Sequence, residues 1–195
     1  MMEKVKLVTQ DYKTRAGEKN ETLWEVGKRV EAVGTGGLCT DGVIHWYDSI
    51  WVALLMNCQH ANIPNPKAIV VEVGEVVDHD GTKGGSRWAT MLREIPVPEM
   101  TTEQRVEIAI RCALAVYHDP EFVEWANKWL SGEDRSREAA WATAWAAAWA
   151  AAWAAEAEAE AAAWAAAWAA KAADRAAISG ANIAAICEQV MEKSE

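Results

Sequence analysis

The sequence predicts an α+β protein, with a small mixed or antiparallel sheet and short helices, followed by an all-α C-terminal region that contains one long Ala/Trp-rich helix. Short β-branched runs separated by turn sequences fill residues 1–98. Pro96 and Pro98 then form a stiff joint, and residues 136–177 contain neither Gly nor Pro. We therefore expect an α+β domain over residues 1–98 and a helical region over residues 99–195.

The strands of the first domain are predicted from apolar runs that end at turn residues. Asp41-Gly42 and Asp80-Gly81 are the strongest turn signals, and residues 68–77 form an almost continuous apolar run that is typical of a buried strand. Ser49, or Asp48 before it, can cap a short helix that ends near Asn57. Strands are expected at residues 5–9, 22–25, 44–47, 68–77 and 90–95.

The helices of the second region follow from capping and breaking residues. Thr101 and Gln104 match a capping box, and Asp119-Pro120 supplies a cap and a first-turn proline for the next helix. Alanine, which has the highest helix propensity, dominates the residues after 138. We expect helices near 102–118, 120–131, 136–177 and 182–192.

A ladder of tryptophans on an alanine background is the most improbable feature of the chain. Six indoles of roughly 150–250 Å² each exceed what a soluble monomer leaves exposed in one patch. Three interpretations stay open: packing against the chain's own helices, an interface of a homo-oligomer, or an aromatic surface for a cationic or flat ligand. The residues of this tentative interface are Trp141, Trp145, Trp149, Trp153, Glu156, Glu160, Trp164 and Trp168.

Composition excludes several classes of protein. The net charge of −10 argues against general nucleic-acid binding, which depends on Lys and Arg. The four cysteines have no paired spacing, so neither a metal site nor a disulfide framework is indicated, and we expect a reducing, cytoplasmic location and no cofactor. The charged N-terminus does not suit a signal peptide, and the alanine-rich run does not suit a membrane span.

The best candidate for a ligand-binding segment is the glycine-rich run 81–88. Its glycines expose backbone N–H groups, Lys83 and Arg87 supply charge, Ser86 a hydroxyl, and Trp88 a surface for stacking. The alternative is a flexible hairpin loop with solvated charges. His45 and Tyr47 are further candidates, for which a purely structural role is the alternative. No catalytic triad is predicted.

Four short motifs stand out along the chain: LCTDG (38–42), His45-x-Tyr47, HANI (60–63) and WLSGEDRS (129–136). In these motifs the chain resembles a family of uncharacterised bacteriophage and bacterial proteins with degenerate Ala-rich tails. The resemblance covers roughly residues 5–138. It implies a phage origin and hence a host-cell cytoplasmic location, but no established activity.

The order of the first elements is also similar to the first half of ADP-ribosyltransferase folds. By that comparison Arg15, His45 and either Glu72 or Glu94 would be the candidates for acting on NAD. The preferred hypothesis is a non-enzymatic, self-associating phage accessory protein. Its ligand would be a nucleotide-type signal or its partner a host defence protein. The alternatives are an ADP-ribosyltransferase-like enzyme and a purely structural helical module.

Overall fold

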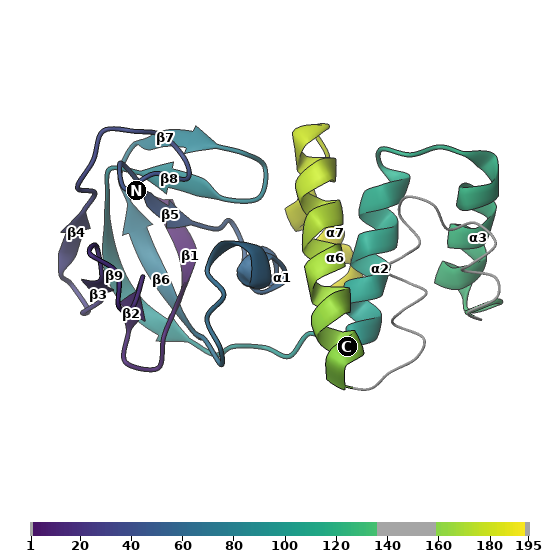
Figure 1. The fold of residues 1–195 in the computed structure, drawn as a ribbon, viewed down its shortest axis with the longest axis horizontal. Helices are drawn as coiled ribbons and strands as arrows, with labels where there is room; N and C mark the ends of the chain where they lie inside the picture. Colours follow the sequence, from purple (N-terminus) through teal and green to yellow (C-terminus); the bar gives the residue numbers. More distant parts are fainter. Residues whose placement is uncertain (1, 136–158, 194–195) are drawn as a thin grey trace. The chain divides into compact units, whose positions relative to one another are not determined.

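The computed structural model describes residues 2–135 and 159–193, and these form two compact units, Met1–Glu99 and Met100–Glu195. The fold is mixed α+β, and all paired strands within its sheets are antiparallel (Figure 1).

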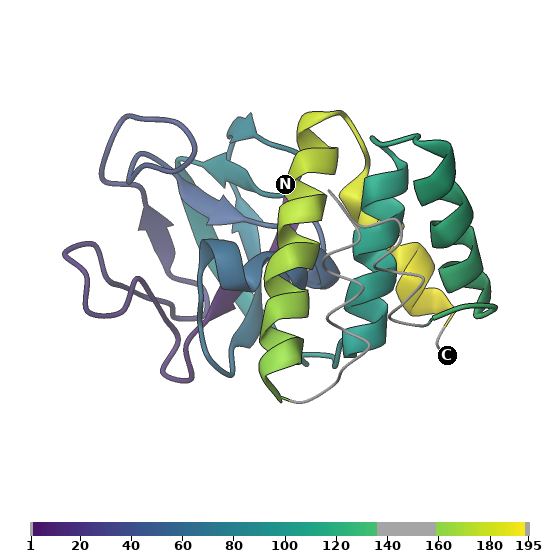
Figure 2. The same ribbon diagram turned by 45° about the vertical axis from the view of Figure 1, so that its right-hand side comes forward.

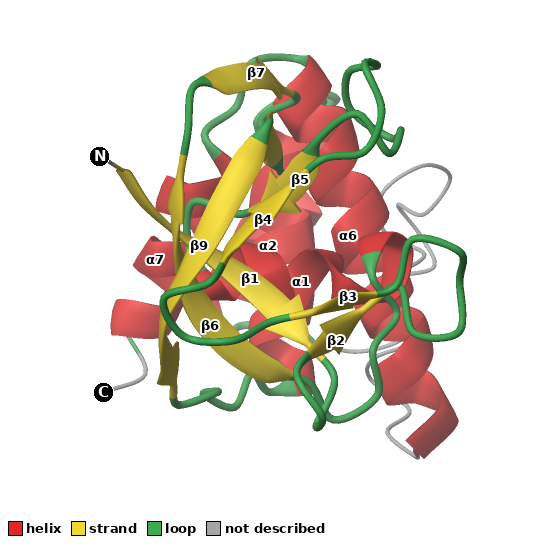
Figure 3. Ribbon diagram, turned by 90° about the vertical axis from the view of Figure 1, so that its left-hand side faces the viewer, coloured by secondary structure: helices red, strands yellow, loops and turns green. Residues whose placement is uncertain are grey.

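Unit 1 is built on three small sheets (Figure 3). The largest has the order β1-β6-β9-β4, the second β5-β8-β7, and the third pairs β2 with β3. Backbone hydrogen bonds between Val5 and Tyr47 link β1 to the chain just after β5, which joins the first two sheets. The strands are β1 (Met2–Val8), β2 (Lys13–Thr14), β3 (Thr22–Leu23), β4 (Arg29–Glu31), β5 (Ile44–Trp46), β6 (Lys67–Val73), β7 (Val76–His79), β8 (Gly84–Ser86) and β9 (Trp88–Ile95).

The core of unit 1 lies where β1, β6 and β9 meet the second sheet. Apolar side chains from these strands are almost completely buried, and the fully buried ring of Trp46 packs among them. Helix α1 (Ile50–His60), capped by the Ser49 hydroxyl, packs its buried side chains against β1. The core cluster comprises Val8, Trp24, Trp46, Ile69, Val71, Val73, Ala89 and Met91.

Two features of this unit differ from the sequence prediction. The strand expected over 68–77 divides into β6 and β7, which end and begin on either side of Gly74 and Glu75. The Trp88 indole packs so closely on Gly74 that a side chain there would clash with it. The loop expected over 81–88 contains a strand, β8, paired on both sides. Its glycines permit this, since Gly84 leaves room for the Trp46 ring.

The described residues of unit 2 form helices. Helix α2 (Thr102–Leu114) begins with the predicted capping box and packs against α3 (Pro120–Ser131), α6 (Ala159–Ile178) and α7 (Ile183–Glu192). Helices α2 and α6 lie side by side in both views (Figures 1 and 2). Alanines of α6 beyond residue 168, such as Ala169 and Ala173, are fully buried, and their small side chains allow this close approach.

A separate apolar cluster joins α2 to α3. Trp125 and Trp129, one helical turn apart on α3, are both buried against Val106 and Ile110 of α2. The left-handed Gly132 ends α3 as the sequence predicts. Most of the long helix predicted for 136–177 lies outside the described residues, so its length stays a prediction.

Candidate functional site

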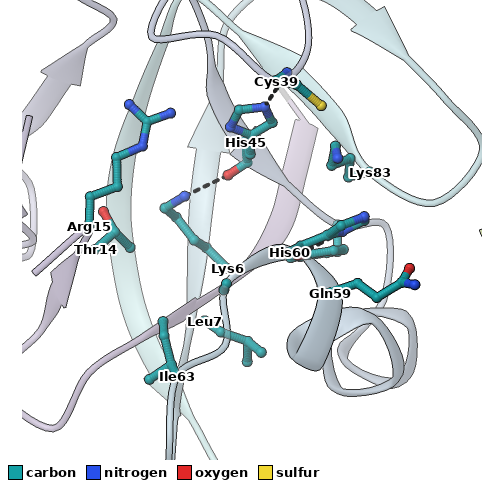
Figure 4. A pocket seen from close by; sticks show the side chains of 12 residues that line it. Lys6, Leu7, Thr14, Arg15, Cys39, His45, Gln59, His60, Ile63 and Lys83 are labelled. Carbon is teal, nitrogen blue, oxygen red and sulfur yellow. Dashed lines mark hydrogen bonds between the residues drawn. The ribbon is translucent and has the colours of Figure 1, made fainter. Parts of the chain in front are cut away.

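A cavity of about 320 Å³ opens in unit 1 between β1, β5 and the end of α1 (Figure 4). This volume is at the lower end of the range for small-molecule sites. The walls come from segments far apart in the sequence. The lining residues are Lys6, Leu7, Thr14, Arg15, Cys39, His45, Tyr47, Gln59, His60, Ala61, Ile63 and Lys83.

Three basic side chains line this pocket, and none of its lining residues is acidic. They are Lys6 of β1, Arg15 after β2 and Lys83 before β8. In a chain with a net charge of −10, such a group of cations around one cavity makes a local region that favours anions.

Lys6 is the cation with the most unusual surroundings. Its Nζ donates a hydrogen bond to the carbonyl oxygen of His45 at 2.7 Å and lies 5.4 Å from the centre of the Trp24 ring. Burial, together with the positive charge of Arg15, lowers the pKa of Lys6 to about 7. At neutral pH this amine therefore exists in both its charged and its neutral form.

Arg15 is held by strained backbone. It has a positive φ of 54°, a conformation that L residues other than Gly adopt at a cost of about 1–2 kcal/mol. Its guanidinium donates to the carbonyl oxygen of Thr40 at 3.3 Å. Strain of this kind is often found where a side chain must point in a particular direction.

Lys83 is positioned by the turn between β7 and β8. One carboxylate oxygen of Asp80 accepts hydrogen bonds from the backbone N–H groups of Thr82 and Lys83 and from the Thr82 hydroxyl, all at 2.8–2.9 Å. Lys83 is only 8% exposed, and its Nζ is 3.7 Å from the other Asp80 oxygen, so the ion pair between them is long.

His45 is a neutral hydrogen-bond acceptor in this site. The backbone N–H of Cys39, a residue with a φ of 63°, donates to its Nε2 at 3.1 Å, so the neutral ring carries its proton on Nδ1. Burial and the charges of Lys6, Lys83 and Arg15 lower the pKa of His45 to about 4. The ring is therefore uncharged at neutral pH.

Tyr47 and His60 add aromatic surface beside the cations. Their rings stack with centroids 5.9 Å apart, and the Tyr47 hydroxyl lies 3.2 Å from Nδ1 of His60. Burial raises the pKa of the Tyr47 phenol, which therefore keeps its proton at neutral pH. The pocket thus combines cations, neutral donors and an aromatic wall.

The structure brings some of the predicted ligand-binding residues together and not others. Lys83, His45 and Tyr47 line the pocket, whereas Ser86, Arg87 and Trp88 are absent from its lining. The buried Ser86 hydroxyl donates to the Trp88 carbonyl oxygen, and the Trp88 ring packs against the Arg29 guanidinium.

Arg87 serves the neighbouring loop instead. Its guanidinium donates to the carbonyl oxygens of Gly36, Gly42 and Thr35 and so ties down the segment that carries Cys39. Arg87 therefore helps to hold the loop that forms one wall of the pocket, without lining the pocket itself.

The residues suggested for an ADP-ribosyltransferase do not form one site. Arg15 and His45 line the pocket, but neither Glu72 nor Glu94 does. Glu94 instead accepts a hydrogen bond from the Tyr12 hydroxyl at 2.5 Å, and Glu72 pairs in register with Glu3 and Thr90 inside the sheet.

Among the charged and aromatic residues of the pocket, sequence reasoning did not select Lys6, and it did not choose His60 as a ligand-binding residue. Arg15 was selected only through the ADP-ribosyltransferase comparison. The HANI motif contains His60, but nothing in the sequence pairs it with Tyr47. The tentative interface residues Trp141, Trp145, Trp149, Trp153 and Glu156 lie outside the described residues. So do the side chains of Glu160, Trp164 and Trp168.

Within the described residues, no group of three or more His, Cys, Asp or Glu side chains is placed to hold a metal ion, and none of the cysteines there forms a disulfide bond. No helix in that part of the chain is long and apolar enough to cross a membrane. No protein-family model matches the sequence, and no curated protein or solved structure is significantly similar to it.

Proposed function

We propose that unit 1 binds a small phosphate-bearing molecule of the nucleotide type in the pocket between Lys6, Arg15 and Lys83. The observation that carries this proposal is the group of three cations around a cavity that no carboxylate lines in the part of the chain that the structure describes. Phosphate oxygens accept charge-assisted hydrogen bonds from both Arg and Lys, and these are about twice as strong as neutral ones.

The rest of the lining supports a nucleotide-type ligand. The cavity of about 320 Å³ suits a pyrophosphate or a mononucleotide better than a larger cofactor. The ring of His60, which stacks on the buried Tyr47, offers aromatic surface on which a base can stack. The neutral His45 and the protonated Tyr47 supply hydrogen bonds without adding a negative charge.

Binding rather than turnover is the role that these residues favour. No carboxylate lines the pocket as a general base, and His45 engages its basic nitrogen with the Cys39 backbone. Two wider hypotheses stay predictions. One is that a phage accessory protein sequesters such a signal, or a host defence protein, in the host cytoplasm. The other is that the tryptophan ladder makes the protein a homo-oligomer.

The test is calorimetric titration of pyrophosphate into the full-length protein and the Lys83→Met variant. Methionine has nearly the length of lysine and removes only the charge, so the fold is retained. We expect one pyrophosphate per chain and an affinity about tenfold lower in the variant, which corresponds to about 1.4 kcal/mol.

Lys28→Met is the matched control, because Lys28 is 57% exposed, pairs with Glu25 and does not line the pocket. It should bind pyrophosphate like the unchanged protein. Absence of binding at millimolar pyrophosphate, or an equal loss in both variants, would refute the proposed site.

A further inference from the structure

We propose that Lys6 forms a reversible imine with a ligand that carries both a carbonyl group and an anionic group. This inference rests on the anion-binding function proposed above and goes beyond nucleotides to a second class of phosphate-bearing ligand, the phosphorylated aldehydes and ketones. It follows from the position of the amine among cations, not from its mere presence in a pocket.

The surroundings of Lys6 are those of a nucleophilic amine. No carboxylate among the described residues lines the larger cavity, whereas Glu31 and Asp41 line a smaller pocket that also includes Lys6. The hydrogen-bond acceptor at Nζ is a backbone carbonyl, that of His45. Figure 4 shows the amine directed to that carbonyl, with Arg15 on one side of it and Lys83 on the other. The Trp24 ring lies beside the amine, 5.4 Å from its centre to Nζ, and contributes an apolar surface.

The protonation state of Lys6 supports the same conclusion. Burial and Arg15 bring its pKa to about 7, so a substantial fraction of the amine has a free lone pair at neutral pH. By contrast, the hydrogen bond and charge of Glu21 raise the pKa of the exposed Lys13 and keep it an ammonium. Desolvation beside another cation is an established way to activate a lysine for imine formation.

The chemistry balances without an oxidant or a further reactant. The Nζ lone pair attacks the carbonyl carbon, a C–N bond forms, and the former carbonyl oxygen takes up a proton. The carbinolamine then loses that oxygen as water, which carries away both amine hydrogens and leaves a C=N bond. Hydrolysis reverses the sequence. The protonated Tyr47 hydroxyl and the Nδ1–H of His45 line the same cavity and can exchange protons with water there.

The other two cations of the pocket, Arg15 and Lys83, indicate that the ligand also carries an anionic group. The guanidinium of Arg15, which can bind an anionic group through two N–H donors, lies in the same cavity as the Lys83 amine. An anionic group held between them raises the local concentration of the attached carbonyl next to Lys6. Carbonyl compounds that lack an anionic group have no such advantage.

The experiment is reductive trapping with pyridoxal 5′-phosphate, an aldehyde that bears a phosphate, and with pyridoxal as its phosphate-free match. Each is incubated with the full-length protein and sodium cyanoborohydride, which reduces an imine to a stable secondary amine. Intact mass and peptide mapping then locate the label. We expect a single adduct on Lys6, at least tenfold more with the phosphorylated aldehyde, and protection by pyrophosphate.

Lys6→Arg keeps the positive charge but cannot form an imine. It should lose the adduct, whereas Lys28→Met, at a residue that does not line the pocket, should keep both the adduct and pyrophosphate binding. Pyrophosphate binding without trapping at Lys6 would overturn the imine and leave the anion site intact. Equal labelling of Lys6 by both aldehydes, without pyrophosphate binding, would overturn the anionic part of the proposal. Label spread evenly over exposed lysines such as Lys13 would overturn the inference as a whole.

Discussion

Replacement of Gly84 by alanine is expected to destabilise the folded protein by about 2–3 kcal/mol, the typical cost of forcing extra atoms into a packed core. A Cβ atom at this position would lie 2.1 Å from Cη2 of Trp46 and 2.2 Å from Cζ2. The indole has no room to move, because Trp46 is only 1% exposed and lies against His79 and the Lys4 amine. Urea denaturation followed by circular dichroism measures the loss.

Two further variants test whether this loss of stability comes from the contact with Trp46. Gly37→Ala, where the new Cβ would meet only the Asp78 carboxylate at 3.4 Å, should change stability by less than about 0.5 kcal/mol. Trp46→Phe in the Gly84→Ala background should restore part of the stability. The shorter ring withdraws from Cβ, and the substitution removes a buried Nε1–H that has no hydrogen-bond partner among the described residues. A Gly84→Ala protein as stable as the original would show that β8 does not pack on Trp46 in this way.

The sequence correctly predicts the start of a helix where side chains close in the sequence cap it. The capping box at Thr101 and Gln104 and the Asp119-Pro120 start are confirmed, because each depends on side chains within three residues. The strand Gly84–Ser86 has no such local signal. A three-residue segment with two glycines is typical of a loop. Glycine is required at position 84 because the Trp46 ring, far away in the sequence, packs against it.

The pocket was less predictable than the fold for a related reason. Lys6 is one lysine of an alternating strand, and its surroundings arise when backbone bonds join Val5 to Tyr47, across more than forty residues. Arg15 points into the cavity from a positive φ, which a sequence reveals for glycine but rarely for arginine. Of the ligand-binding residues chosen from the sequence, Lys83, His45 and Tyr47 line the pocket, and each lies beside a turn that the sequence signals.

Without a bound anion, the cations of the pocket should lower the free energy of unfolding. Replacement of Lys6 is the clearest way to measure this effect. We expect Lys6→Met to stabilise the unliganded protein at pH 6.5 by about 2 kcal/mol. The full change from 10.5 to about 7 in the pKa of Lys6 would correspond to about 5 kcal/mol. Water entering the open pocket and the loss of the hydrogen bond to the His45 carbonyl, worth about 1 kcal/mol, reduce that gain.

The direction of the pH dependence follows from proton uptake. Above pH 10.5 Lys6 is neutral in both states, so its charge has no effect on folding. As the pH falls from 10.5 to 7, the unfolded chain binds a proton that the folded protein does not, and the unfolded state is favoured until the penalty is complete near pH 7. The advantage of Lys6→Met should therefore shrink between pH 6.5 and pH 9.5 in urea denaturation. Burial, the largest cause of the low His45 pKa of about 4, does not depend on Lys6 and keeps the His45 ring neutral between pH 6.5 and pH 9.5.

Lys13→Met provides a control with the opposite sign, because Glu21 and Asp11 stabilise the Lys13 ammonium in the folded protein. That variant should be destabilised at pH 6.5. If the stability gained by Lys6→Met is the same at both pH values, Lys6 is an ordinary ammonium and the imine loses its nucleophile, while the anion site keeps all three of its charges. If the gain falls as expected, the empty pocket stores part of the energy that an anionic ligand recovers on binding, since the ligand neutralises the repulsion among Lys6, Arg15 and Lys83.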